Sequence, residues 1–287
     1  MDDLTQFEQE GFFAVESLNV PEYVEVEFGP FLDSYRKLNR IAWTLQYSLP
    51  KFKPANYETT RRSYCFILYA RTINFVQAAV ILGTKGMRVQ ADTQLRCAIE
   101  ALFKLGALSN DRELIIDYDL AELADRIRQL KAYINYLNRR KPKNKESIKK
   151  AERSCKEHID RLKAKRPEVF KDSKEKDALK KFSISTEKYA SKADLLDIYD
   201  LYYRSGSAAV HSDSQSLEDG HFVLNSDGTV NAFKNEPHLE GLGKFIYELC
   251  AIVFDAILFV GKGLDYKIPE DELKVLDDAL EACLQKT

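Results

Sequence analysis

The stretch from Asn56 to Leu82 constrains the fold more than any other part of the chain. Its apolar residues surround almost the whole circumference of a helix instead of forming one stripe, and such a helix is buried on several sides. Asn56 and Thr59 are candidate caps for its start, and the Gly-Thr-Lys-Gly sequence at 83–86 ends it. The chain therefore predicts a central helix against which other helices must pack.

Further helices are predicted wherever apolar residues recur at helical spacing. They span residues 21–49, 87–108, 112–137, 193–210, 239–264 and 269–284. The only predicted strands flank the turn residues Asn225 to Gly228, as a small hairpin after the helix at 193–210. The expected fold class is all-α, a bundle of about six to eight helices with this one β-hairpin.

Three parts of the chain are predicted. Residues 1–20 form an N-terminal arm with aromatic anchors, residues 21–138 and 182–287 form a single helical domain, and residues 139–181 form a basic helical insertion. The insertion has 18 Lys and Arg against 8 Asp and Glu, whereas the net charge of the whole chain is −2.

A charge run of this kind is typical of a solvated helix or hairpin, but the insertion is also the only basic patch in the sequence. Phosphate contacts dominate non-specific affinity for nucleic acids. The candidate nucleic-acid contacts are Lys149, Lys150, Arg153 and Lys156. Aromatic residues are nearly absent from the insertion, which argues against the stacking of single strands on it.

Composition and motifs exclude several classes of protein. The five cysteines are odd in number and widely spaced, as in reduced intracellular thiols, and not as in a disulfide framework or a zinc site. No signal peptide is visible, and the longest apolar run, Leu249 to Val260, is too short to cross a bilayer. Walker, Rossmann and serine-hydrolase motifs are absent. We expect a cytoplasmic protein with no membrane contact, no metal and no cofactor.

Asp255 interrupts the longest apolar run. An unpaired buried charge is very costly, so this carboxylate either reaches solvent between helical turns or pairs with a buried cation. Arg96 and Arg204 are the candidate cations.

The polar end of the helix at 193–210 contains the strongest candidate for chemistry. Arg204 and His211 are seven positions apart, which is close to two helical turns, so both point to one side about 10 Å apart along the axis. The residues between them are mostly small and leave that face open. A fixed cation and a titratable imidazole on one open face suit reactions of phosphates and hydroxyls.

Arg96 and Glu100 have the spacing of neighbours on one helix face. One interpretation is a solvent-facing salt bridge of little energetic weight. The other is that both side chains face a polar cleft shared with His211, where Glu100 orients the imidazole or Arg96 binds a phosphate.

These residues carry a resemblance to a known superfamily. Arg204, Ser205 and His211 resemble the R-x(4–6)-H motif of the HEPN superfamily (higher eukaryotes and prokaryotes nucleotide-binding domains). The Arg96-x-x-x-Glu100 helix, followed by Tyr203-x-x-x-Ser207-x-x-x-His211, is still more similar to an uncharacterised bacterial HEPN-like family.

The resemblance implies a metal-independent endoribonuclease that acts as a toxin-like or antiphage effector. His211 is then the general acid or base and Arg204 stabilises the phosphate, while Ser205 or Ser207 positions the scissile group and Tyr203 supports the cleft. The implied partners are an RNA substrate, a second copy of the chain and a regulatory or defence-system protein.

The alternative is a catalytically inactive HEPN-like module that binds a nucleotide, a nucleic acid or a protein. Arg204 then pairs with Glu100 or Asp255, and His211 bonds a backbone carbonyl at the end of its helix. Ser205 stands where active members of the superfamily often have Asn, Asp or His, which favours this alternative.

Overall fold

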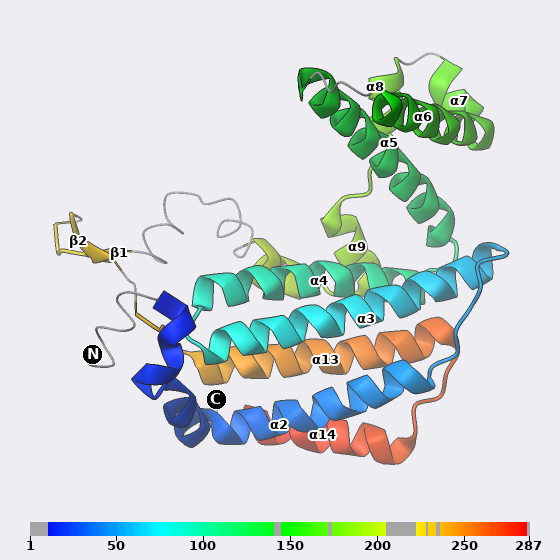
Figure 1. Ribbon diagram of the computed structural model, residues 1–287. Coiled ribbons are helices and arrows are strands. Elements are labelled where there is room, and N and C mark those ends of the chain that lie inside the picture. The colour runs from blue at the N-terminus through cyan, green and yellow to red at the C-terminus, as the bar shows by residue number, and fades with distance from the viewer. Residues whose placement is uncertain are drawn as a thin grey trace. The chain divides into compact units, whose positions relative to one another are not determined.

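The predicted central helix is α3 (Tyr57–Thr84), and it packs against α4 (Arg88–Asn110), α13 (Leu242–Leu264) and α2 (Val20–Ser48). Figure 1 shows these four helices side by side, with α14 (Glu270–Leu284) against α2. The computed structural model describes residues 11–140, 145–171, 174–204, 222–227, 229–233 and 236–285. The all-α class is confirmed.

The capping of α3 is as the sequence predicts. The Asn56 side chain accepts a hydrogen bond from the backbone N–H of Thr59 at 2.9 Å, and Thr59 Oγ1 accepts one from the backbone N–H of Asn56 at 3.1 Å. This reciprocal pair satisfies two backbone donors that the first turn of a helix leaves without partners. By length and composition α3 could also span a membrane, but in this bundle it is the helix on which three others pack.

The turn after α3 requires a glycine at position 86. Gly86 has a φ of +76°, and a Cβ atom there would lie 2.4 Å from the Cβ of Pro237. Its carbonyl also accepts a hydrogen bond from the backbone N–H of His238 at 2.9 Å. The start of α4 is thereby held against the segment that leads into α13.

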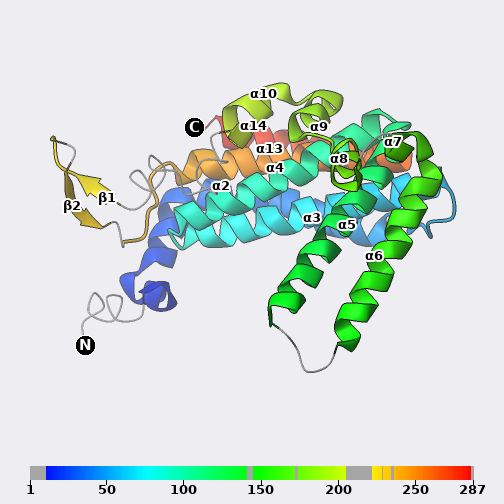
Figure 2. The ribbon, with the colours of Figure 1, turned by 90° about the horizontal axis from the view of Figure 1, so that it is seen from above.

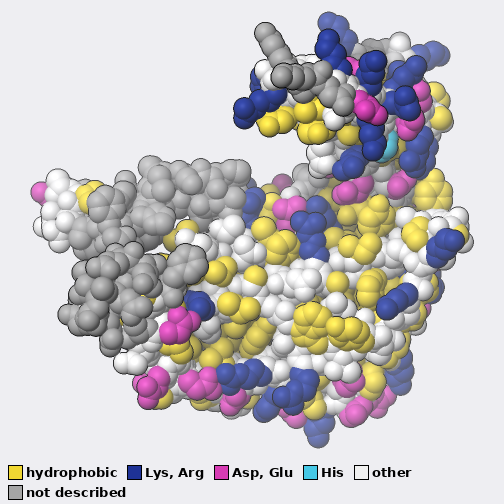
Figure 3. Space-filling view, in the orientation of Figure 1, with side chains coloured by type: hydrophobic (Ala, Val, Ile, Leu, Met, Phe, Trp, Pro, Cys, Tyr) yellow, Lys and Arg dark blue, Asp and Glu magenta, His cyan; other side chains and the backbone are white. Residues whose placement is uncertain are grey.

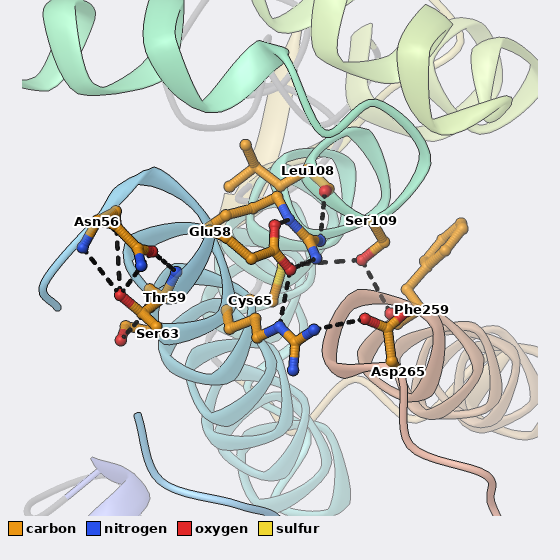
Figure 4. A network of polar contacts seen from close by, with 11 residues as sticks. Asn56, Glu58, Thr59, Ser63, Cys65, Leu108, Ser109, Phe259 and Asp265 are labelled. Atoms are coloured by element: carbon orange, nitrogen blue, oxygen red, sulfur yellow. Dashed lines mark hydrogen bonds and ion pairs between the residues drawn. The ribbon is translucent and has the colours of Figure 1, made fainter. Parts of the chain in front are cut away.

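A polar network that includes Glu58, Leu108 and Asp265 joins the ends of α3, α4 and α13 (Figure 4). Arg61 on α3 is 0% exposed, and its Nη1 donates to the carbonyl oxygen of Leu108 on α4 at 3.1 Å. Its Nε and Nη2 donate to the carboxylate of Glu58 at 2.9 and 2.7 Å. Arg62 pairs with the same carboxylate and with Asp265, which follows α13. The Nε, Nη1 and Nη2 atoms of Arg61 all donate to acceptors within the bundle, so its role is structural.

The segment that contains Arg204 differs from the helix predicted at 193–210. It consists of α9 (Thr186–Ala193), a break at Asp194, where φ is +63°, then α10 (Leu196–Ile198) and η2 (Tyr199–Tyr203). The predicted start at Ala193 is therefore wrong. Beyond Arg204, residues 205–221 lie outside the described part of the chain, so the predicted hydrogen bond of His211 and its position relative to Arg204 lie there too.

The element η2 is a π-helical turn, in which the backbone N–H of Arg204 bonds the carbonyl of Tyr199. A bond from i to i−5 shifts the phase of the side chains relative to an α-helix. Tyr203 consequently faces the core, whereas Leu196 and Leu201, which helical spacing predicts to be buried, are exposed.

Residues Asp111–Lys188 form a second compact unit with a hydrophobic core of its own. It contains α5 (Leu114–Arg140), α6 (Glu146–Lys165), α7 (Pro167–Lys171) and α8 (Glu175–Lys180). The fully buried members of its core are Ala124, Ile127 and Leu162. The basic segment at 139–181 lies within this unit, where α5 and α6 lie side by side (Figure 2).

Short segments complete the described chain. The described part of the N-terminal arm is a 3-10 helix, η1 (Gly11–Leu18), in which Val15 is buried. Between η2 and α13, β1 (Phe222–Leu224) pairs antiparallel with β2 (Val230–Phe233). The five cysteines are free thiols.

Candidate functional site

Two tyrosines of the π-turn form the base of the candidate site. The rings of Tyr199 and Tyr203 stack with their centroids 5.4 Å apart and their planes at 19°. Tyr203 is buried and also contacts the ring of Phe103 on α4, with the centroids 5.9 Å apart. π-Turns interrupt helices at a cost in regular hydrogen bonding and frequently occur at functional sites. This turn holds the aromatic pair firmly against α4.

Arg96 on α4 lies directly over this pair. Its Nη2 donates to the Tyr203 hydroxyl at 3.2 Å, and its guanidinium carbon lies 4.8 Å from the centre of the Tyr203 ring. Its Nε is buried without a hydrogen-bond acceptor, and no described carboxylate pairs with it. A buried donor without an acceptor is costly, although the Arg96 side chain as a whole is only partly buried. Arg96 therefore keeps one unsatisfied donor, its Nε, for which a ligand could supply an acceptor.

Glu100 does not form the salt bridge with Arg96 that the first interpretation of the pair required. Its carboxylate accepts from Lys104 Nζ at 3.0 Å instead. The order Glu then Lys at i,i+4 agrees with the helix dipole, whereas the order Arg then Glu opposes it. The predicted Arg96–Glu100 salt bridge is therefore wrong. The second interpretation depends on His211, which lies outside the described residues.

Arg204 is an exposed cation at the end of η2. Its side chain is 67% exposed, its Nη1 pairs with Asp200 at 3.1 Å, and its guanidinium carbon lies 5.8 Å from the centre of the Tyr199 ring. The predicted pairing of Arg204 with Glu100 or Asp255 is wrong. Ser205, Ser207 and His211 lie outside the described residues.

Asp255 on α13 is mostly buried and forms neither an ion pair nor a hydrogen bond with a described residue. Burial raises the pKa of this carboxyl to about 6, with no charged neighbour to offset it. The hypothesis that it pairs with Arg96 or Arg204 is wrong for the described residues.

A cavity that the sequence did not predict lies between the first turns of α4 and α13. It measures about 370 Å³ and is lined by Arg88, Asp92, His238, Glu240, Gly241, Lys244, Phe245 and Glu248. Arg88 pairs with Asp92 at 3.0 Å, and its guanidinium carbon lies 4.4 Å from the centre of the Phe245 ring.

Burial raises the pKa of two of the carboxyls that line this cavity, Asp92 and Glu248. Glu248 accepts a hydrogen bond from Tyr202, so the cavity is joined directly to the π-turn. The sequence contained one signal for this cavity. Glu248, like Asp255, is an acid within a strongly apolar helix.

The predicted nucleic-acid contacts are on the second unit. Lys149, Lys150, Arg153 and Lys156 are exposed on α6. Within the described part of the chain, no group of three or more His, Cys, Asp or Glu side chains could hold a metal ion.

These features define a class, an all-α protein with an arginine- and tyrosine-rich polar site beside a π-turn. The chain belongs to DUF5677, a family of unknown function whose model matches residues 62–229, more than half of the chain. The match extends from α3 through the second unit and η2 to the strand region. No curated protein and no solved structure matches the chain. The HEPN resemblance stays a prediction from the residues.

Replacement of Asp255 by Asn is expected to stabilise the protein at pH 7.5 and to change little at pH 4. The folded-state pKa of about 6 lies above the usual 3.8, so the ionised form destabilises the fold increasingly as the pH rises through this window. The gain in the free energy of unfolding should approach about 3 kcal/mol above pH 6. Urea unfolding at the two pH values measures it.

Asp277→Asn is the matched control, because Asp277 is an exposed acid on α14. We expect no change in stability for this variant at either pH. A loss of stability in Asp255→Asn at pH 7.5 would mean that the carboxylate makes a favourable interaction with residues outside the described part of the chain.

Proposed function

We propose that the chain is a metal-independent endoribonuclease of the HEPN type. In this proposal Arg204 stabilises the charge on the scissile phosphate and His211 is the general acid or base. The observation that carries it is the presentation of Arg204, a solvent-accessible guanidinium held by Asp200 and Tyr199 at the end of a π-turn. A cation fixed in advance, where charge develops in the transition state, is among the largest contributions to catalysis.

The reaction requires only groups of this chain and of its substrate. The ribose 2′-oxygen attacks the phosphorus while His211 takes the hydroxyl proton, and the bond to the 5′-oxygen breaks as that oxygen receives a proton from the imidazolium that His211 has become. The products are a 2′,3′-cyclic phosphate and a 5′-hydroxyl. Arg96 supports the proposal as a second cation, because its free Nε and its contact with Tyr203 place it beside the residue that precedes Arg204.

The biological setting and the assembly belong to the same proposal. The enzyme is a cytoplasmic, toxin-like or antiphage effector that acts as a homodimer and is controlled by a regulatory or defence-system partner. Outside Asp111–Lys188 the chain has 20 Lys and Arg against 30 Asp and Glu. Two copies of the Arg204 and His211 pair in one composite site would concentrate positive charge in an otherwise acidic bundle.

A second candidate is favoured by the cavity between α4 and α13. Its volume of about 370 Å³ and its charged lining fit a small polar ligand. In this case the chain is an inactive HEPN-like module that binds a nucleotide or a similar small molecule, and the hydrogen bond from Tyr202 to Glu248 relays occupancy to the π-turn.

Cleavage of total cellular RNA in the presence of a chelator tests the proposal. We expect the wild-type chain to cleave, with a rate that changes around neutral pH as an imidazole titrates. His211→Ala should lower the rate at least about 100-fold, the usual range for a general acid or base. His158→Ala is the control, since the His158 ring bonds the backbone carbonyl of Ser154 within α6.

Two outcomes would contradict the proposal. One is cleavage that the chelator abolishes. The other is no cleavage by the wild-type chain on any RNA, with binding of a nucleotide that His238→Ala weakens, which would support the module with a ligand cavity.

A further inference from the structure

The second unit differs in charge from the rest of the chain. Residues Asp111–Lys188 contain 23 Lys and Arg against 15 Asp and Glu, whereas the rest of the chain has an excess of acids. Figure 3 shows Lys and Arg side chains over much of the visible surface of this unit. A polyanion that meets this protein is therefore attracted to the second unit and repelled by the bundle.

Part of this positive charge is not neutralised within the unit. Several of its cations pair with acids, namely Lys131 with Glu175, Lys165 with Asp119 and Arg128 with Asp125. Lys149, Arg153 and Lys156 are different, because they form no ion pair with any described residue. Their spacing of four and three positions places them on one exposed side of α6, away from its buried face.

Two exposed tyrosines lie at the same end of the unit. Tyr133 and Tyr136, in the last two turns of α5, are 47% and 46% exposed. Their rings stack with the centroids 6.5 Å apart and the planes at 18°, and the guanidinium carbon of Arg140 lies 5.6 Å from the centre of the Tyr136 ring. Only residues 141–145 separate α5 from α6, so the last turns of α5 and the first turns of α6 are neighbours.

We propose that this end of the second unit binds single-stranded nucleic acid. Unpaired bases stack on Tyr133 and Tyr136, and the phosphates on either side contact Arg140, Lys149 and Arg153. Aromatic platforms beside a cationic track are the usual means of binding single strands, because every base offers a face for stacking. A duplex keeps its bases stacked on one another and would use the cations alone.

The inference rests on the second unit alone and not on the proposed cleavage. The basic segment at 139–181 has few aromatic residues of its own, but neighbouring tyrosines can supply the stacking that it lacks. The aromatic pair comes from α5, just before residues 139–181.

Fluorescence anisotropy with a 2′-O-methyl strand of about 15 nucleotides tests the inference, because such a strand contains no 2′-hydroxyl and cannot be cleaved. We expect the full chain to bind the single strand more tightly than a duplex of the same sequence. Replacing Tyr133 and Tyr136 together by Ala should weaken binding to the single strand about 10-fold or more. Tyr47→Ala is the control, since Tyr47 is an exposed tyrosine that stacks on Trp43 in the acidic bundle.

The phosphate contacts have a separate readout in the dependence of affinity on salt. Lys149→Glu with Arg153→Glu should reduce the slope of log K against log salt by about 1.4, which is about 0.7 for each lost contact with a single strand. Lys37→Glu with Arg40→Glu, two exposed cations on α2, should leave the slope unchanged. All of these side chains are exposed, so the melting temperatures should stay close to that of the wild type.

Three outcomes would overturn the inference. The first is equal affinity for single strand and duplex with no effect of the tyrosine replacements. The second is binding to vesicles containing phosphatidylserine but not to the strand. The third is no binding to either probe. Cleavage by Arg204 and His211 can succeed or fail independently of each of these results.

Discussion

Arg61→Ala should lower the free energy of unfolding by about 3–5 kcal/mol, the range found when a large, fully buried side chain is truncated to Ala. Arg61 is fully buried and donates three hydrogen bonds, to both oxygens of Glu58 and to the carbonyl of Leu108. The truncated variant leaves that carbonyl without its partner and a cavity between α3 and α4. Both effects act in the same direction.

Arg36→Ala is the matched control for this prediction. Arg36 also contacts both oxygens of one glutamate, with Nη1 and Nη2 at 3.0 and 2.8 Å from Glu25, but its side chain is 50% exposed. An exposed pair of this kind contributes little to stability, because solvent screens it. Urea unfolding of both variants at pH 7 measures the difference, and equal small losses would show that Arg61 is not an essential part of the network.

The dependence on pH supplies a second readout for Arg61. Its hydrogen bonds to Glu58, with those of Arg62, lower the pKa of that carboxyl from 4.5 to about 2. The stabilisation is therefore complete above pH 4.5 and is lost as the pH falls towards 2. In Arg61→Ala this acid-dependent loss should be smaller, because the carboxyl keeps only Arg62 as a strong partner.

The part of the fold that was predictable is the part fixed by apolar pattern and capping. The central position of α3 follows from apolar residues on all its sides, and its start follows from Asn56 and Thr59. Arg61 was not predicted to be buried, because it adjoins Arg62 and nothing in the pattern says which arginine points inward. The π-turn was not predictable either, since helical spacing assumes one period and η2 departs from it.

Only part of the candidate site was predictable, because its contacts depend on tertiary packing as well as on helical spacing. Arg96 and Tyr203 are 107 positions apart and meet through a hydrogen bond, and only the resemblance to a HEPN-like family had connected them. Lys104 was overlooked as the partner of Glu100, although its position is the more favourable one on a helix. The unusual position of Asp255 was evident from the apolar run around it, but whether a cation reaches it depends on tertiary packing.

Arg204→Ala should reduce cleavage of RNA about 100- to 1,000-fold, as expected when a charge-stabilising group is removed from the transition state. Arg204→Lys should retain a part of the activity, because an ammonium keeps the charge but cannot form the two parallel hydrogen bonds of a guanidinium. Since Arg204 is mostly exposed and its pair with Asp200 is a surface pair, stability should change by less than about 1 kcal/mol. A fall in activity would then reflect chemistry and not unfolding.

Lys267→Ala is the control for Arg204, because Lys267 is also an exposed cation in a local pair, with Glu270 at 3.1 Å. We expect its cleavage rate to equal that of the wild type. Asp200→Ala separates positioning from charge, since it frees the Arg204 guanidinium without removing it, and a moderate loss of rate is expected. If Arg204→Ala cleaves as fast as the wild type while His211→Ala does not, the phosphate is stabilised by another cation, and Arg96 with its unsatisfied Nε is the group to replace next.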